Sequence, residues 1–288
     1  DLAHRQIVTP EGWAEHDPME IWANVLTVSR LVMERCGVEP GQIRAIAIAN
    51  QRETAVCWRR STGLPLYNAV TWQCARAEEL TWALSTRETE ARVRAVTGLR
   101  LSPYFSAAKF SWLLKNVGDV ARAASEEDLC FGTVDAWLIY RLTRGVSFRT
   151  DVSNASRTQL LDLDSLDWSP EMLGLFGIER RMLPEVCESN SLFGYSDLDG
   201  LLPEPVPICG VLGDSQAALL GNGCLDRGGA KLTLGTGTSV MVNAGSARPR
   251  LSGGVVESVG WKLNGRLCYV AEGNINYTGA LIVWLKDR

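Results

Sequence analysis

The chain has 288 residues, of which 46% are hydrophobic and 22% charged, and its formal net charge is -4 at pH 7. This is ordinary globular composition, long enough for one large domain plus part of another, without the basic surplus that proteins use to coat a phosphate backbone, so no nucleic-acid partner is expected. Its apolar runs are too short to cross a bilayer and its N-terminus has no apolar signal segment, so we predict no membrane association and a soluble, cytoplasmic protein.

The first predicted elements are a helix and two short strands. Asp17 and Pro18 precede apolar residues at helical spacing that continue to Gly37, which predicts an amphipathic helix with Asp17 as its N-cap. A short β-branched run at 43–49 ends in Asn50-Gln51-Arg52-Glu53, and an extended pattern resumes at 54–58. We therefore expect a strand, a polar connecting turn and a second strand.

The middle of the chain has a mixed α/β pattern. Helical patterns cover about 76–97, 107–117 and 133–143, another helix starts near Ser169, and the run 158–163 is compatible with a further strand. A strand at 206–212 closes on Gly213-Asp214 and precedes a helix of small residues at 215–220.

After residue 222 the pattern changes to hairpins. Strands are predicted at 230–234, 238–244, 255–259 and 266–271. This shift indicates a domain boundary near 222, with one domain at 1–222 and the start of a second at 223–288.

Cysteine and histidine usage excludes several kinds of chemistry. The eight cysteines form no C-x-x-C pair, and most lie in apolar runs such as Ile208-Cys209-Gly210, which favours reduced core thiols over disulfides or zinc. The only histidines are His4 and His16, so a Ser-His-Asp or Cys-His mechanism is not expected. No metal site made by the protein alone is predicted.

Three polar clusters follow predicted strands, where the side chains of an α/β sheet converge on ligands. The guanidinium of Arg52 can donate hydrogen bonds to the hydroxyls of a polyol, and the carboxylate of Glu53 can accept them. A solvated loop with a surface ion pair is the alternative interpretation of the same two residues. Asp214 is placed to accept a proton from a hydroxyl, or to cap a helix. The turn Gly235-Thr236-Gly237 could cradle phosphate oxygens, or be a plain hairpin turn.

The residue sequences of several segments, and the order in which they occur, indicate the protein family more specifically than any one cluster does. In order and spacing the chain resembles glycerol kinases of the FGGY family of carbohydrate kinases at residues 48–54, 68–73, 103–106, 131–138, 151–158, 182–186, 213–214 and 235–237. The resemblance implies an α/β, actin-like (RNase H-like) two-domain sugar kinase fold in which the second domain is incomplete. It also implies that the first domain binds the polyol and that the second mainly binds ATP.

Site roles follow from this resemblance position by position. It implies that the polyol is bound by Arg52, Glu53, Trp72, Tyr104, Asp214 and Ser215, with Asp214 as the general base. It implies that ATP is bound by Gly235, Thr236, Gly237 and Gly279, with Mg²⁺ bridging the phosphates. Family members are commonly dimers or tetramers, so a homo-oligomer is an expectation.

The chain also departs from the family pattern. The N-terminal Asp-x-Gly-Thr phosphate loop and the later adenine-binding segment are absent, so we expect the 288 residues to lack half of the ATP site. Ser215 and Val283 stand where the family usually has Gln. The segment 197–205 lacks the Gly-x-x-Arg loop used by some bacterial members for fructose 1,6-bisphosphate, so inhibition by that route is not expected.

The predicted function is ATP-dependent phosphorylation of a small polyol, with glycerol giving glycerol 3-phosphate. A kinase for another polyol or sugar is the nearest alternative. A fragment that binds a polyol without phosphorylating it is the alternative from another class: the absent phosphate loop favours it, and the presence of Arg52, Glu53, Asp214 and Thr236 argues against it.

Overall fold

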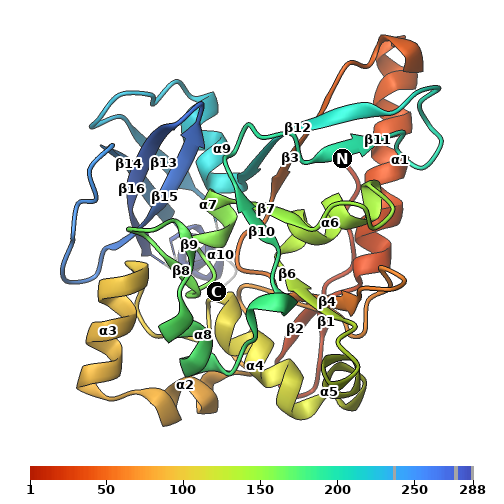
Figure 1. Cartoon of the computed structure of the whole chain (residues 1–288). Helices are drawn as coiled ribbons and strands as arrows, with labels where there is room; N and C mark the ends of the chain where they lie inside the picture. The colour runs from red at the N-terminus through yellow and green to blue at the C-terminus, as the bar shows by residue number, and fades with distance from the viewer. Residues whose placement is uncertain (236–237, 276–277, 287–288) are drawn as a thin grey trace.

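The computed structural model describes residues 1–235, 238–275 and 278–286 (Figure 1). Its helices are α1 Pro18–Cys36, α2 Glu78–Leu84, α3 Arg87–Thr97, α4 Ser106–Asn116, α5 Gly118–Ser125, α6 Val134–Leu142, α7 Val152–Ala155, α8 Pro170–Phe176, α9 Asp214–Gly221 and α10 Gly279–Lys286, with short 3-10 turns at Pro40–Gln42 and Arg180–Met182.

Within the described ranges, the strands form six small sheets. The strands are β1 Ile7–Val8, β2 Ala14–His16, β3 Ile46–Asn50, β4 Val56–Arg59, β5 Ala69–Val70, β6 Leu129–Gly132, β7 Arg149–Asp151, β8 Leu161–Asp162, β9 Asp167–Trp168, β10 Glu185–Cys187, β11 Gly194–Ser196, β12 Val206–Gly213, β13 Ala230–Leu234, β14 Thr238–Gly245, β15 Val256–Leu263 and β16 Arg266–Ile275. Their orders are β1-β2-β5, β10-β7, β11-β12-β3, β13-β14-β16-β15, β4-β6 and β8-β9.

The pairing of β3 with β12 determines where the polar segments meet. These strands are parallel, with Gly213 beside Asn50 at their carboxyl ends. The segments that follow both strands therefore leave the sheet at the same edge. The fully antiparallel sheet formed by β13 to β16 lies beside α9, at the left of Figure 1.

Local sequence accounts for α1 as predicted. The Asp17 side chain accepts a hydrogen bond from the Met19 amide, Pro18 occupies the first turn, and Gly37 closes the helix with a φ of 62°. Ile21, Trp22 and Met33 are buried on its inner face. The predicted strand, connecting turn and strand at 43–58, the strand at 206–212, the helix at 215–220 and the four later strands are also confirmed, with shifted ends.

Other element predictions were wrong. The pattern at 76–97 is two helices, α2 and α3, because the Thr86 side chain caps the amide of Thr89 and starts a new helix. α5, α7 and β6 were not predicted; α7 is a single turn capped by Asp151, too short to show a period. The run 158–163 contributes only the two-residue strand β8.

Two buried clusters form most of the core. One contains Phe110 and Phe131, whose rings stack with centroids 4.6 Å apart, and the other surrounds Trp58 and Trp137. All eight cysteines are free thiols, as predicted. The expectation that Cys209 is a core thiol was wrong: Cys209 is exposed, because its neighbour Ile208 takes the inward position on β12.

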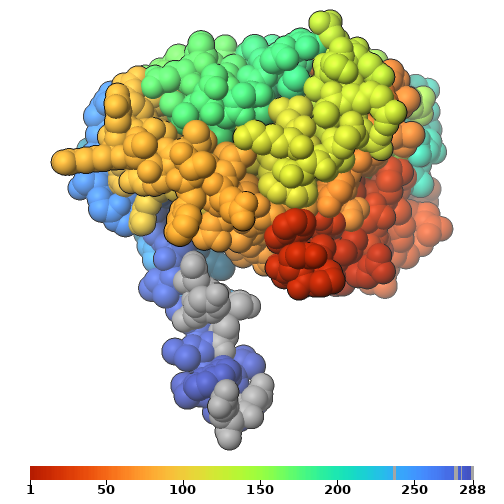
Figure 2. Space-filling view, turned by 90° about the horizontal axis from the view of Figure 1, so that it is seen from below, coloured from red at the N-terminus to blue at the C-terminus, as the bar shows by residue number. Residues whose placement is uncertain are grey.

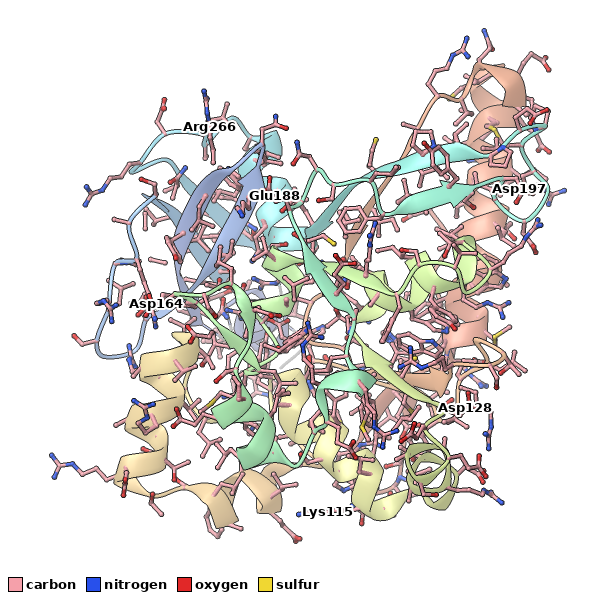
Figure 3. All side chains as sticks on the ribbon, viewed as in Figure 1. Lys115, Asp128, Asp164, Glu188, Asp197 and Arg266 are labelled. Carbon is pink, nitrogen blue, oxygen red and sulfur yellow. The ribbon has the colours of Figure 1, made fainter. Side chains whose placement is uncertain are left out.

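Charged contacts tie the β13–β16 sheet to the rest of the chain. Asp164, in the β8–β9 turn, pairs with Arg248 at 3.2 Å and Arg250 at 3.3 Å. Glu188 pairs with Lys262 at 3.1 Å. Figure 3 labels both acids, which lie at two separate places along this junction.

The helix α10 is the least covered element of the fold. Figure 2 shows the last part of the chain standing out from the body of the molecule. Leu281, Ile282, Val283 and Leu285 are each more than half exposed. Among the described residues, no helix is both long and apolar enough to cross a membrane.

Candidate active site

The site starts at the shared edge of β3 and β12. Arg52 and Glu53 follow β3, and Asp214 is the first residue of α9. The Nε atom of Arg52 lies 3.4 Å from Oδ1 of Asp214. The parallel pairing therefore brings together two of the three clusters that the sequence singled out.

Burial decides between the two interpretations of Arg52 and Glu53. Only 6% of the Arg52 surface and 2% of the Glu53 surface are exposed. The alternative of a solvated loop with a surface ion pair is therefore wrong. These charges are held inside the protein, where each needs partners to offset its lost hydration.

Those partners are Glu272, from β16, and Arg157, which follows α7. Arg52 binds Glu272 through both terminal nitrogens at 2.9 Å each. Arg157 donates from Nε to Glu53 at 2.5 Å, and its Nη1 lies 3.2 Å from Glu272. We call Arg52, Glu53, Arg157 and Glu272 the buried charge cluster; it joins three separate segments of the chain.

Arg52 and Glu272 stabilise each other's charged form. Burial alone would raise the pKa of Glu272, but the Arg157 and Arg52 guanidinium groups outweigh burial and hold that pKa well below its ordinary value. For Arg52, burial opposes the charged form, while Glu272 and Glu53 together raise the pKa well above its ordinary value. Arg52 and Glu272 therefore stay charged across the physiological pH range.

Asp214 differs from the cluster because it faces solvent. Its side chain is 56% exposed, and its Oδ1 accepts the Ser215 amide at 2.6 Å. The N-cap residue of α9 is Gly213, so the interpretation of Asp214 as an N-cap was wrong. A reachable carboxylate beside a fixed guanidinium can bind a hydroxyl and accept its proton.

A buried polar network fixes the strand ends behind Asp214. The Gly213 amide donates to the Ser153 hydroxyl at 3.0 Å, and that hydroxyl donates to Asp151 at 2.9 Å. Nearby Asp135 accepts hydrogen bonds from Thr133 and Thr150, and burial raises its pKa to about 6. Gly213 leaves no room for a side chain, since an added Cβ would lie 2.8 Å from the Arg52 side chain.

Tyr104 lies beside the cluster, and the ring of Trp72 contacts the ring of Tyr104. The rings of Trp72 and Tyr104 meet edge to face with centroids 5.7 Å apart, and Trp72 is 40% exposed. Burial, followed by the negative charge of Glu53, raises the pKa of Tyr104. Tyr104 therefore keeps its proton and can donate a hydrogen bond.

The residues expected to bind ATP lie at the end of β13 and the start of α10. The Gly279 amide donates to the Gly235 carbonyl at 3.0 Å, so these two are brought together. Thr236 and Gly237 lie outside the described residues. β13 and β14 pair antiparallel, with Leu234 opposite Thr238. Among the described residues, no hydrogen bond or ion pair links Gly235 or Gly279 to Asp214.

Sequence reasoning missed Arg157, Glu272 and Lys231. Arg157 lies within the 151–158 segment that carries the resemblance, and a lone acid after an apolar strand was the signal for Glu272. Lys231, on β13, is nearly buried; burial and then repulsion by Arg52 lower its pKa. A cavity of about 430 Å³ is lined in part by Arg60, Arg141 and Arg144. None of the candidate site residues lines it.

The sequence of the chain is similar to those of known proteins. Residues 1–221 match the N-terminal domain of the FGGY family of carbohydrate kinases. The chain is 48% identical over 286 residues to glycerol kinase 1 of Thermotoga maritima and 42% identical over 286 residues to a glycerol kinase of Bdellovibrio bacteriovorus. Each match covers 99% of this chain and 58% of the relative, so the chain spans somewhat over half of their length.

Solved structures give the same result for the fold. A Plasmodium falciparum glycerol kinase with ADP matches with a TM-score of 0.92 and 35% identity, over 99% of this chain and 57% of that one. A sugar kinase described as a xylulose-type kinase from Brucella ovis matches with a TM-score of 0.85 and 22% identity, over 98% and 56%. The predicted actin-like sugar kinase fold is thereby confirmed.

Proposed function

The chain belongs to the FGGY family of carbohydrate kinases, and we propose that it serves the transfer of the γ-phosphoryl group of ATP to a hydroxyl of a small polyol, glycerol being the preferred acceptor. One observation carries this proposal: the exposed carboxylate of Asp214 lies 3.4 Å from the buried guanidinium of Arg52. Curated relatives named as glycerol kinases support the choice of glycerol.

In the proposed mechanism the buried charge cluster orients the polyol. Arg52 and Glu53 bind neighbouring hydroxyls as donor and acceptor, Tyr104 donates a third hydrogen bond, and Trp72 covers the carbon chain. Asp214 accepts the proton of the reacting hydroxyl as its oxygen attacks the γ-phosphorus and the bond to the β-phosphate oxygen breaks. Ser215 lies next to the base and leaves space beside the polyol.

The nucleotide requirements of the reaction belong to the same proposal. Gly235, Thr236, Gly237 and Gly279 are proposed to approach the phosphates through backbone amides. We propose that a Mg²⁺ ion is held mainly by ATP phosphates and water. That ion would neutralise charge on the transferred group.

Three further predictions accompany this proposal. The domains are proposed to divide near residue 222, with polyol binding in 1–222 and nucleotide binding from 223 onward. A cytoplasmic location and a dimeric or tetrameric state remain predictions. Light scattering after size-exclusion chromatography measures the oligomeric state.

The test uses two proteins. One is the 288-residue chain, titrated calorimetrically with glycerol; the other is a chimera with these residues in place of the matching segment of the Thermotoga maritima relative. We expect the chain to bind glycerol and turn over only at background rate, and the chimera to release ADP when glycerol, ATP and Mg²⁺ are all present.

A panel of polyols and sugars in the coupled ADP-release assay tests the preference for glycerol. Higher kcat/KM for another polyol would replace glycerol as the substrate. Glycerol binding without turnover by the chimera would support the binding-module alternative. Robust turnover by the 288 residues alone would refute the expectation that a further phosphate loop is required.

A further inference from the structure

Glu53 has an unusual backbone conformation. Its φ is +61°, a left-handed value that costs a residue with a Cβ free energy. Glu53 also carries a carboxylate that must point into the buried charge cluster. A strained residue at a binding site persists only when its surroundings hold it.

Two side chains from α4 hold the carbonyl oxygen of Glu53. The Ser106 hydroxyl donates to it at 3.1 Å, and the Lys109 ammonium donates to it at 3.0 Å. Lys109 also donates to the carbonyl oxygen of Tyr104. One cation therefore binds the backbones of two residues that we assign to polyol binding.

Burying the Lys109 ammonium beside these two carbonyl groups costs desolvation free energy. It is completely buried, and within the described residues it forms no ion pair with a carboxylate. The charges that face it are Glu53 and Arg76, with the thiol of Cys74 and the ring of Tyr104, whose centroid is 6.0 Å away. An apolar side chain of similar length would fill the space without the desolvation cost.

The ordinary explanation is a core lysine that simply satisfies two carbonyl groups. That explanation does not account for the choice of carbonyls, because one belongs to the strained residue and the other to its neighbour in the site. We propose that Lys109 is a positioning residue, which holds Glu53 in its left-handed conformation and fixes Tyr104 relative to it for polyol binding. This inference rests on the proposed function.

The decisive variant is Lys109→Met, which keeps the length and removes both hydrogen bonds. Because binding groups lose affinity steeply when they move by fractions of an ångström, we expect glycerol binding to weaken about tenfold or more. Ser106→Ala removes only one donor and should weaken glycerol binding to a smaller extent. In the Thermotoga maritima chimera, the KM for glycerol should rise while the KM for ATP stays unchanged.

Ser111→Ala is the matched control. Ser111 is a buried residue one turn further along α4 and donates to Ala107 and Phe176 instead. It should lower stability like Ser106→Ala while leaving glycerol affinity unchanged. If Lys109→Met binds glycerol like the unaltered chain, or if Ser111→Ala weakens binding equally, the positioning role is refuted.

A crystal structure of Lys109→Met separates this inference from the proposed function. Movement of Glu53 out of its positive φ, with displacement of Tyr104, is expected. Unchanged Glu53 and Tyr104 would overturn the inference even if glycerol proved to be the wrong ligand. Failure of the unaltered chain to bind any polyol, with Glu53 still displaced in the variant, would instead reject only the proposed function.

Discussion

The polyol half and the nucleotide half of the site are built differently. Around Arg52 the functional groups are buried side chains, joined by bidentate and shared ion pairs from three segments. Around Gly235 and Gly279 the described contacts are two hydrogen bonds to the Gly235 carbonyl, one from the Gly279 amide and one from the Thr278 hydroxyl, and Gly235 is exposed. The first region is held by charge pairing and should be sensitive to single side chains; the second presents mainly backbone and should be much less sensitive to them.

The largest effect is expected from breaking the buried charge cluster. Glu272→Ala leaves Arg52 and Arg157 as buried cations without their shared carboxylate, so we expect a loss of about 3–5 kcal/mol in the free energy of unfolding. Denaturant titration measures it. Glu171→Ala, which breaks an exposed pair with Arg92, should cost no more than about 1 kcal/mol. Equal losses for the two variants would contradict the comparison.

Asp214→Asn tests the reachable carboxylate at the edge of the cluster. A general base contributes about 10²–10⁴ in rate, so kcat of the chimera should fall at least about a hundredfold. Glycerol affinity should fall less, because the amide keeps one acceptor oxygen. The melting temperature should not change, because this side chain is mostly exposed. Near-normal turnover would eliminate Asp214 as the base, and the exposed Asp226→Asn is the control.

The same contrast explains what the sequence could predict. α1 was predictable because Asp17, Pro18 and Gly37 are local signals, and the meeting of Arg52 with Asp214 followed from strands that end in polar residues. Arg157 and Glu272 were missed because a buried charge is assigned to its partner by tertiary contacts. Their separations from Arg52, of 105 and 220 residues, leave no periodic trace in the sequence.

Local sequence patterns also gave wrong predictions where two of them overlapped in one segment. The pattern at 76–97 looked like one helix, and only the cap formed by Thr86 divides it. Ile208-Cys209-Gly210 looked like a buried run, but alternation along β12 turns Cys209 outward. The strained conformation of Glu53 had no signal at all, because left-handed backbone at a non-glycine residue is imposed by its surroundings.

Lys109 gives a pH test of the polyol half. Burial lowers the pKa of Lys109 from 10.5 to about 7 in the folded chain, so between these values the unfolded chain binds a proton that the folded chain has released. Stability from this residue is therefore greatest above the unfolded pKa and is lost as pH falls through about 7.

Relative to Lys109→Met, the unaltered chain should gain about 1–3 kcal/mol in unfolding free energy between pH 7 and about pH 9. Denaturant titrations of both proteins at several pH values measure this difference. A difference that stays constant across the range would show that Lys109 keeps an ordinary pKa.

The smallest effect is expected in the nucleotide half, at Val283 on α10. Val283 is 57% exposed and occupies a position where the family usually has Gln, so Val283→Gln should change the unfolding free energy by less than about 0.5 kcal/mol. A new neutral hydrogen bond contributes about 0.5–1.5 kcal/mol, so ATP affinity of the chimera should improve by about twofold to tenfold.

Leu281→Gln, at another exposed position of α10, should leave ATP affinity unchanged. Calorimetric titration with a non-hydrolysable ATP analogue measures both variants. A loss of affinity, or an equal gain in both variants, would mean that α10 does not present Val283 to the nucleotide. The contrast between a side-chain half and a backbone half of the site would then rest on Gly235 and Gly279 alone.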